Sequence, residues 1–338
     1  MNKQLFAIIL SFATGVIPVL GQANLAQTEP SKIYNQGVEL FEKKKYNLAY
    51  KYFDQYITEA EGKEFAKPSS DLSKAEYYKA VSAKGSNSSL AEKLLLDFID
   101  DYAGTSGVYP AFYHLGDLYF KKANYKDAIK YYALTESESL SPEEKDDLAF
   151  NYAFSYFALK NFREAYSKFA PLTNQPTAKN YNYAVYYSGL SAYYLEKYDD
   201  ALKQFYKLEN STKYKNVVPY YIASILSLKK QYPEMIAYLE PKIESNKNLR
   251  YGNEIKKLLG NAYFEKKDYV LAEKYLSESI PSLTKVNQED YYQLGYVYYK
   301  NGQYKKAIEQ LKKLTTLDNE MVQSAMYVLG QCYTQTGD

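Results

Sequence analysis

Paired aspartates are the residues whose type and spacing come closest to a catalytic arrangement in this sequence. Two carboxylates a few residues apart could act together as general acid and general base. The pairs are Asp97 with Asp101, Asp146 with Asp147, and Asp199 with Asp200. Each pair falls at an expected helix end or turn, without a histidine or a nucleophile beside it. We therefore interpret the three pairs as solvated charges at helix ends.

Histidine and cysteine, the other residues that commonly carry chemistry, occur once each, as His114 and Cys332. A metal centre needs several such ligands, and an intrachain disulfide needs two cysteines. The sequence also has no phosphate-binding loop, nucleophile elbow or dinucleotide fingerprint. We therefore expect a protein without metal, cofactor or catalytic activity, in which His114 and Cys332 have structural roles.

The composition is that of an ordered chain with little net charge. Of the 338 residues 42 are tyrosines, and 46% of all residues are hydrophobic. This apolar content is too high for a disordered protein. The 42 basic and 40 acidic residues leave a formal net charge of +2. Such a charge creates no field that would attract nucleic acid, so we expect no nucleic-acid partner.

The N-terminus has the pattern of a secretory signal. Lys3 precedes a nearly unbroken apolar run from Leu5 to Leu20, and small residues follow at Gly21 and Ala23. We expect residues 1–22 to be a signal peptide and residues 23–30 an exposed leader. The mature protein would then be exported to the periplasm or cell envelope, with no integral membrane segment after cleavage.

The elements that position all these residues follow one repeated pattern, which is clearest in residues 291–311. There it consists of Tyr291, Leu294-Gly295, Tyr298, a polar turn, Ala307 and Leu311. The small residue of this pattern, Gly295, has counterparts along the chain. The full set is Gly37, Gly116, Ala153, Gly189, Ala223, Gly260, Gly295 and Gly330. From Gly116 onward these residues are 34 to 37 positions apart. A repeat of this length predicts stacked supersecondary units.

A second small residue and a large apolar residue complete most repeats. Twelve positions after the first small residue stand Ala49, Ala128, Ala165, Ala201, Met235, Ala272 and Ala307. Four positions later stand Phe53, Tyr132, Phe169, Phe205, Leu239, Leu276 and Leu311. Small residues on both helices of a pair would let their backbones approach closely, while the large residues fill the groove around them.

This pattern resembles the tetratricopeptide repeat, whose period is about 34 residues. The resemblance covers residues 31–338 and implies an all-α fold, an α-solenoid of antiparallel helix pairs. We expect about eight units and a final incomplete one. The first unit would be residues 31–58, a loop insertion residues 59–70, and the continued solenoid residues 71–338. A weaker unit at residues 71–102 has Ala91 and Leu95 in its second helix but lacks the Leu-Gly pair.

The last unit breaks off early in the pattern. It has Leu329, Gly330 and Tyr333, but no second helix follows before Asp338. Solenoids normally end in a capping element that covers the exposed apolar face. We therefore expect the 338 residues to be the N-terminal part of a longer protein, truncated within its last unit.

In this family the first helices line a concave face, and ligands contact residues three before, one after, and four or five after the small residue. In this sequence most residues three before and four after it are aromatic, and the candidates are Tyr113, Phe120, Phe150, Phe157, Tyr186, Tyr193, Tyr220, Tyr292 and Tyr299. We call these nine residues the aromatic ladder. Tyrosine combines contact area with a hydrogen-bonding tip, which suits recognition of peptides or sugars. The alternative is that the rings only pack between neighbouring first helices.

The resemblance implies a non-catalytic scaffold that binds protein or peptide segments in its concave groove, with a role in cell-envelope assembly or maintenance. Two alternatives remain open. One is a glycan-binding module in which the tyrosines stack on sugar rings of the envelope. The other is the helper region of an enzyme whose catalytic domain lies beyond the C-terminus.

Overall fold

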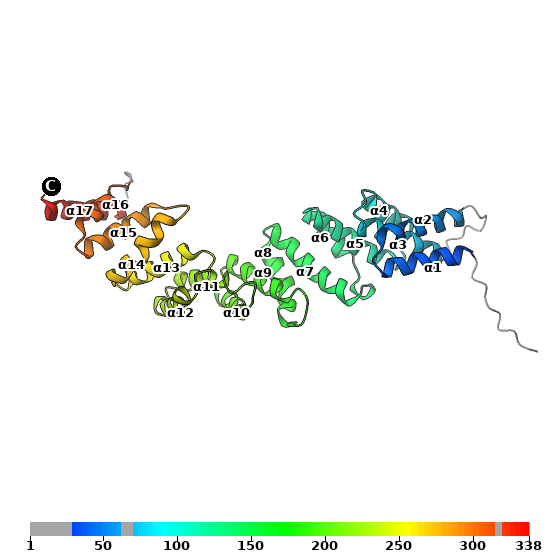
Figure 1. Ribbon diagram of the computed structural model, residues 1–338, viewed down its shortest axis with the longest axis horizontal. Helices are drawn as coiled ribbons and strands as arrows, with labels where there is room; N and C mark the ends of the chain where they lie inside the picture. The colour runs from blue at the N-terminus through cyan, green and yellow to red at the C-terminus, as the bar shows by residue number, and fades with distance from the viewer. Residues whose placement is uncertain (1–28, 62–69, 315–319, 338) are drawn as a thin grey trace, which may run out of the picture. The chain divides into compact units, whose positions relative to one another are not determined.

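The computed structural model describes residues 29–61, 70–314 and 320–337, and in them the chain forms 17 α-helices and no β-strand (Figure 1). Each helix packs mainly on its neighbours in the sequence. The predicted all-α helical repeat fold is thus confirmed. The predicted signal peptide lies outside the described residues. The chain divides into two compact units, Met1–His114 and Leu115–Asp338, whose boundary falls inside helix α5.

Unit 1 contains two helix pairs and the start of a third. Its helices are α1 (Glu29–Glu42), α2 (Tyr46–Glu61), α3 (Ser70–Gly85), α4 (Ala91–Asp101) and the first half of α5 (Val108–Lys121). Two predicted boundaries fall within helices. α1 already includes Glu29 and Pro30 of the expected leader. α2 continues to Glu61 and α3 begins at Ser70, so both helices extend into the expected insertion at residues 59–70. The residues between them, 62–69, lie outside the described part.

Unit 2 continues the alternation of first and second helices, and short 3₁₀ turns join some of its pairs. Its helices are α6 (Tyr125–Ala133), α7 (Pro142–Ala158), α8 (Phe162–Phe169), α9 (Tyr181–Tyr194), α10 (Tyr198–Lys207), α11 (Val218–Leu228), α12 (Tyr232–Ser245), α13 (Gly252–Glu265), α14 (Tyr269–Ser279), α15 (Gln288–Lys300), α16 (Tyr304–Leu311) and α17 (Glu320–Thr336). The odd-numbered helices, α5 included, are the first helices of their pairs, and the even-numbered ones are the second helices. Within the described residues, none of the helices has the length and apolar character needed to cross a membrane.

The small residues lie where the two helices of a pair cross. A Cβ atom added to Gly295 would lie 2.7 Å from Leu311, and one added to Gly189 would lie 2.8 Å from Phe205. Gly37, Gly116 and Gly260 meet the residue 16 positions later in the same way. The predicted close crossing is therefore confirmed at these five glycines. It is not found at Gly330, where an added Cβ would meet nothing within 4 Å.

The turn inside each pair has a repeated backbone geometry. One residue, seven positions after the small residue, adopts the left-handed conformation. These residues are Lys44, Asn87, Ala123, Lys160, Glu196, Lys230, Lys267 and Gly302, with φ between 55° and 73°. In the weaker unit, the residue seven positions before Asn87 is Ala80, which is buried and takes the place of the small residue. The unit therefore keeps the turn geometry and a buried small residue although its sequence lacks the Leu-Gly pair.

Candidate functional site

The first helices of unit 2 form one face of the unit. First helices of successive pairs contact one another, as in α7 with α9, α13 with α15, and α15 with α17. Second helices of successive pairs in the described residues do not approach each other as closely. The side formed by the first helices is therefore the inner side, and we call it the first-helix face.

The aromatic ladder lies between these helices rather than free on their surface. Eight of its nine residues are half-buried, and Tyr113, which belongs to unit 1, is buried. The ring of Phe120 contacts Phe154 of the next first helix at 5.8 Å between centroids. It also contacts Tyr125 of its own second helix at 5.8 Å. A ladder residue can thus join two repeats.

The same packing continues along α7 and α9. The rings of Phe150 and Phe157 on α7 lie 6.3 and 4.9 Å from the ring of Tyr187 on α9. Phe150 also contacts Phe169 of the second helix α8 at 5.8 Å. These edge-on and tilted contacts are the geometries that aromatic rings prefer. Both phenylalanines therefore stabilise the docking of α9 on α7.

A tyrosine cluster follows on α9 and α11. The Tyr186 ring stacks on Tyr214 at 4.4 Å, and its hydroxyl lies 3.5 Å from the Tyr221 hydroxyl. Tyr193 also contacts Tyr221, at 6.1 Å, and Tyr220 contacts Tyr251 at 4.7 Å. Burial raises the pKa values of Tyr186 and Tyr193. The direction of these shifts agrees with the partial burial of both hydroxyls.

The ladder ends differently at α13 and α15. The ladder position of α13 is Lys257, which forms an ion pair with the buried Asp290 of α15. The rings of Tyr292 and Tyr299 on α15 lie 5.9 and 6.1 Å from Tyr296. The nine predicted residues therefore form separate groups along the array. A ladder residue whose ring has an exposed edge can pack between helices and still contact a partner.

Three exposed apolar residues of helices α7, α9 and α11 lie one or two positions beyond the ladder, and the predicted site residues did not include them. Leu159, Tyr194 and Leu228 follow or end helices α7, α9 and α11, and are 42%, 53% and 55% exposed. We call these three residues the apolar rim. The Tyr194 ring stacks on Phe162 at 4.5 Å. Tyr194 and Leu228 stand five positions after the small residue, one of the ligand positions that the family resemblance implies, although neither was among the nine predicted residues.

Charged residues stand at the equivalent position on both sides of the apolar rim. The fifth residue after the small residue is Lys121 in α5, Glu265 in α13 and Lys300 in α15. Exposed apolar residues occupy this position in α9 and α11, as Tyr194 and Leu228, whereas Leu159 lies one position further along in the repeat of α7. Such a bounded apolar area is typical of an interaction site.

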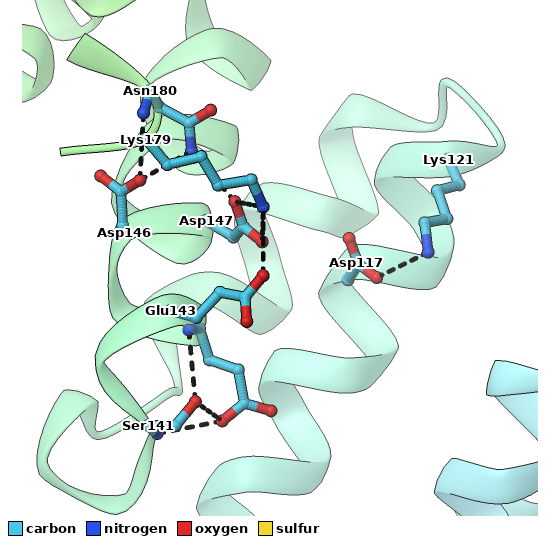
Figure 2. Close-up of polar contacts among 9 residues, drawn as sticks. Asp117, Lys121, Ser141, Glu143, Asp146, Asp147, Lys179 and Asn180 are labelled. Carbon is cyan, nitrogen blue, oxygen red and sulfur yellow. Dashed lines mark hydrogen bonds and ion pairs between the residues drawn. The ribbon is translucent and has the colours of Figure 1, made fainter. Parts of the chain in front are cut away.

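The pair Asp146 and Asp147 has a structural role that the sequence analysis did not predict (Figure 2). Asp146 accepts hydrogen bonds from the backbone and side-chain nitrogens of Asn180 at 3.2 and 3.1 Å. Asp147 binds the Lys179 ammonium at 3.1 Å. We call these four residues the α7–α9 clamp. The interpretation of this pair as solvated charge was wrong, because both carboxylates attach the next repeat.

The second pair acts in the same way. Asp200 accepts a hydrogen bond from the Tyr166 hydroxyl of the preceding repeat at 2.9 Å, and Asp199 forms an ion pair with Lys229 of the following repeat. The pair therefore connects three repeats. In the described residues the side-chain partners of these two pairs are Asn180, Lys179, Tyr166 and Lys229.

A surface cavity of about 880 Å³ lies beside the α7–α9 clamp, between the first turn of α7 and residues 172–179. Its walls include Pro142, Leu172 and Pro176. Across the described part of the chain, no group of three or more His, Cys, Asp or Glu residues is placed to hold a metal ion. The cavity lies between two successive repeats, and Glu143, Asp146 and Lys179 are also among its lining residues.

His114 and Cys332 are both buried in the packing of their helices. The His114 ring nitrogens lie 2.9 Å from the Tyr77 hydroxyl and 3.2 Å from the Lys84 ammonium. Burial raises the pKa of the Cys332 thiol, which lowers its reactivity at neutral pH. Their positions agree with structural roles.

Comparisons with protein families support the repeat assignment. A family model described as tetratricopeptide repeat matches residues 109–134. A second, described as anaphase-promoting complex, cyclosome, subunit 3, matches residues 266–338. No curated protein sequence matches the chain.

Solved structures of similar architecture are numerous. One is a tetratricopeptide repeat protein from Parabacteroides merdae, with 15% identity, 77% of this chain and 98% of that chain covered, and a TM-score of 0.41. Another is the TPR domain of P58(IPK), with 14% identity, coverages of 91% and 99%, and a TM-score of 0.33. A chain of the Naa15/Naa10 complex bound to HypK-THB has 12% identity, coverages of 92% and 47%, and a TM-score of 0.53. At that score the last comparison shows a shared fold.

Proposed function

We propose, since the chain is built from tetratricopeptide repeats, that it is a non-catalytic scaffold that binds a segment of another protein along the first-helix face of unit 2. The observation that carries this proposal is the apolar rim. Leu159, Tyr194 and Leu228 expose apolar side chains on three successive first helices, although burial of such side chains would favour folding. A partner that covers them gains the hydrophobic free energy that the isolated chain does not.

A peptide fits this face better than a glycan does. Stacking on a sugar needs an open ring face, and the rings of the aromatic ladder contact other rings. Tyr194 has one face stacked on Phe162, at an angle of 19° between ring planes. Leu159 and Leu228 offer apolar area but no hydrogen bond, which suits aliphatic and aromatic side chains of a peptide.

The cellular place of this scaffold is part of the proposal. The apolar run of Leu5–Leu20 after Lys3 supports export by a cleaved signal. We propose that the mature chain acts in the periplasm or cell envelope, where it helps to assemble or maintain an envelope complex. Cell fractionation and N-terminal sequencing test this part, and an uncleaved Met1 form in the inner membrane would contradict it.

The binding proposal is tested by a double variant of the apolar rim. We expect Tyr194→Ala with Leu228→Ala to reduce recovery of the partner from envelope extract to less than about a tenth, because few interface residues usually supply most of the binding free energy. Tyr206→Ala with Val270→Ala is the matched control, since both residues are exposed and apolar but lie on second helices.

Substitution of the ladder tyrosines is a weaker test. Tyr186, Tyr193 and Tyr220 contact rings on neighbouring elements, so their joint replacement by Ala removes packing as well as surface. Circular dichroism of each variant separates the two effects. Full partner recovery by a folded variant of the apolar rim would refute the binding proposal.

A further inference from the structure

A polar cavity of about 420 Å³ lies in unit 2, between residues 209–216, which precede α11, and residues 242–249, which end and follow α12. Leu249 is the one apolar residue among the described residues that line it, and the others carry charged, amide or hydroxyl side chains. Burial of a polar group without a hydrogen bond is costly. A ligand that fills this cavity must therefore be polar over most of its surface.

The walls of the cavity keep one positive charge that no carboxylate balances. Glu209 accepts a hydrogen bond from the Tyr238 hydroxyl and forms an ion pair with Lys242, each at 2.8 Å. Lys215 is exposed, and within the described residues its ammonium has no hydrogen bond and no ion pair. A lysine ammonium binds anionic oxygens as a point charge. The charge of the cavity therefore favours an anionic ligand.

The loop that closes the cavity is held in one conformation. Asn246 Nδ2 donates to Asn216 Oδ1, and the backbone N–H of Arg250 donates to the carbonyl oxygen of Asn216, each at 2.8 Å. Tyr251 adopts a left-handed conformation with φ 63°, and its ring lies 4.7 Å from Tyr220. A bulky residue keeps such a conformation only where its surroundings enforce it. The cavity is thus formed before a ligand arrives, which lowers the cost of binding.

Two amides in the walls have hydrogen-bonding capacity to spare. Asn216 uses its Oδ1 for Asn246, and Asn248 donates its backbone N–H to Asn246 Oδ1 at 2.9 Å. Among the described residues, nothing accepts a hydrogen bond from Asn216 Nδ2 or pairs with the Asn248 side chain. A side-chain amide offers both donors and an acceptor, which suits hydroxyl groups.

We propose that this cavity binds an acidic sugar, with Lys215 on its carboxylate or phosphate and the amides of Asn216 and Asn248 on its hydroxyls. An acidic peptide fits less well, because peptide binding usually relies on large anchor side chains and Leu249 alone offers them apolar contact. The proposal does not depend on the apolar rim. The cavity lies beside the N-terminal end of α11, whereas Leu228 is at the C-terminal end.

Glucuronate, glucose 6-phosphate and glucose are the probes, and their binding to the full chain is measured by ligand-observed NMR titration. We expect at least one acidic sugar to bind about tenfold or more tightly than glucose, because glucose lacks the charge that meets Lys215. The tighter of the two acidic sugars identifies the anionic group. Lys215→Ala should reduce this preference to less than about twofold. Lys266→Ala, which removes an exposed lysine of a turn between paired helices, should leave it unchanged.

Asn248→Ala should weaken the binding of all three sugars, and circular dichroism checks that each variant folds. The double variant Tyr194→Ala with Leu228→Ala should bind the sugars like the parent, so the test is separate from that of the apolar rim. Absence of saturable binding up to about 50 mM sugar, equal binding of glucose and the acidic sugars, or an unchanged preference in Lys215→Ala would overturn the proposal. Binding of inorganic phosphate or of a tetraglutamate peptide as tight as that of the acidic sugars would also overturn it, and would assign the cavity to a simple anion or to an acidic peptide.

Discussion

At the scale of single residues, the repeat depends on pairs of one small and one large side chain across each helix crossing. Gly295 and Leu311 are one such pair, and Gly189 and Phe205 are another. The sequence predicted these pairs because their spacing is constant. It could not predict that Gly330 lacks a partner side chain in the described structure, since the residue type is the same.

The first prediction compares one substitution at two equivalent positions. Gly295→Leu should lower the free energy of unfolding by about 1 to 3 kcal/mol, because the new side chain collides with Leu311. Ala307→Phe should have a similar effect at the same crossing, where Ala307 is fully buried. Gly330→Leu should cost nothing. Urea denaturation measures all three, and equal loss at positions 295 and 330 would show that the assigned crossing is wrong.

The second prediction concerns tyrosine ionisation. Burial, followed by the hydrogen bond to Asp200, raises the pKa of Tyr166 from 10.0 to about 12. Burial also raises the pKa of Tyr34 to about 12. Because the folded pKa exceeds the unfolded one, both groups contribute stability that is complete below pH 10 and is lost between pH 10 and 12.

Ultraviolet titration of tyrosinate should therefore show native midpoints above those in denaturant, and the melting temperature should fall steeply over this pH range. Tyr166→Phe should make the fall less steep. Identical titration curves in the native and denatured states would contradict the burial of these hydroxyls.

At the scale of elements, the turns between paired helices hold the register of the array. Each described pair uses one left-handed residue, and only the turn with Gly302 supplies glycine there. The sequence predicted polar turns but not the left-handed backbone conformation within them. Lysine and glutamate occupy most of these positions, and neither residue type favours that conformation. Backbone geometry common to all repeats thus overrides the preference of the local residue.

The third prediction follows from this turn. Lys267→Gly should raise the free energy of unfolding by about 0.5 kcal/mol, because relief of left-handed strain exceeds the entropy cost of glycine. The matched change Gly302→Ala should lower it by about 1 kcal/mol. Thermal melts of both variants test the turn geometry. Opposite signs to those expected would contradict it.

The fourth prediction separates the two halves of the α7–α9 clamp. Asp146→Ala removes the acceptor of two Asn180 donors and should cost about 1 to 2 kcal/mol. Lys179→Ala removes an ammonium that is largely exposed and should cost less than about 1 kcal/mol, although its hydrogen bond to Asp147 raises the pKa of Lys179. Equal effects in chemical denaturation would show that the clamp depends on charge rather than on Asn180.

At the scale of the whole molecule, the sequence predicted the architecture better than the site. Constant spacing revealed the helix pairs, since a crossing like that of Gly295 and Leu311 needs a small residue and a large residue at the same separation in each repeat. The apolar rim escaped prediction because Leu159, Tyr194 and Leu228 differ in type and lie where the first helix ends. Burial of the aromatic ladder was also hard to predict, because each ring is covered by residues outside its own helix. Tyr186, for example, stacks on Tyr214.

The central claim is that a protein partner binds the first-helix face, and site-specific photo-crosslinking in the cell tests it most directly. A photoreactive residue is placed at Tyr194 or Leu228 on the apolar rim, and at Tyr206 or Val270 on second helices. All four residues are exposed and apolar, so they differ mainly in the face they occupy. The account predicts adducts to another protein from the two positions on the apolar rim and few from the other two. Adducts of equal yield from all four positions, or from Tyr206 and Val270 alone, would contradict it.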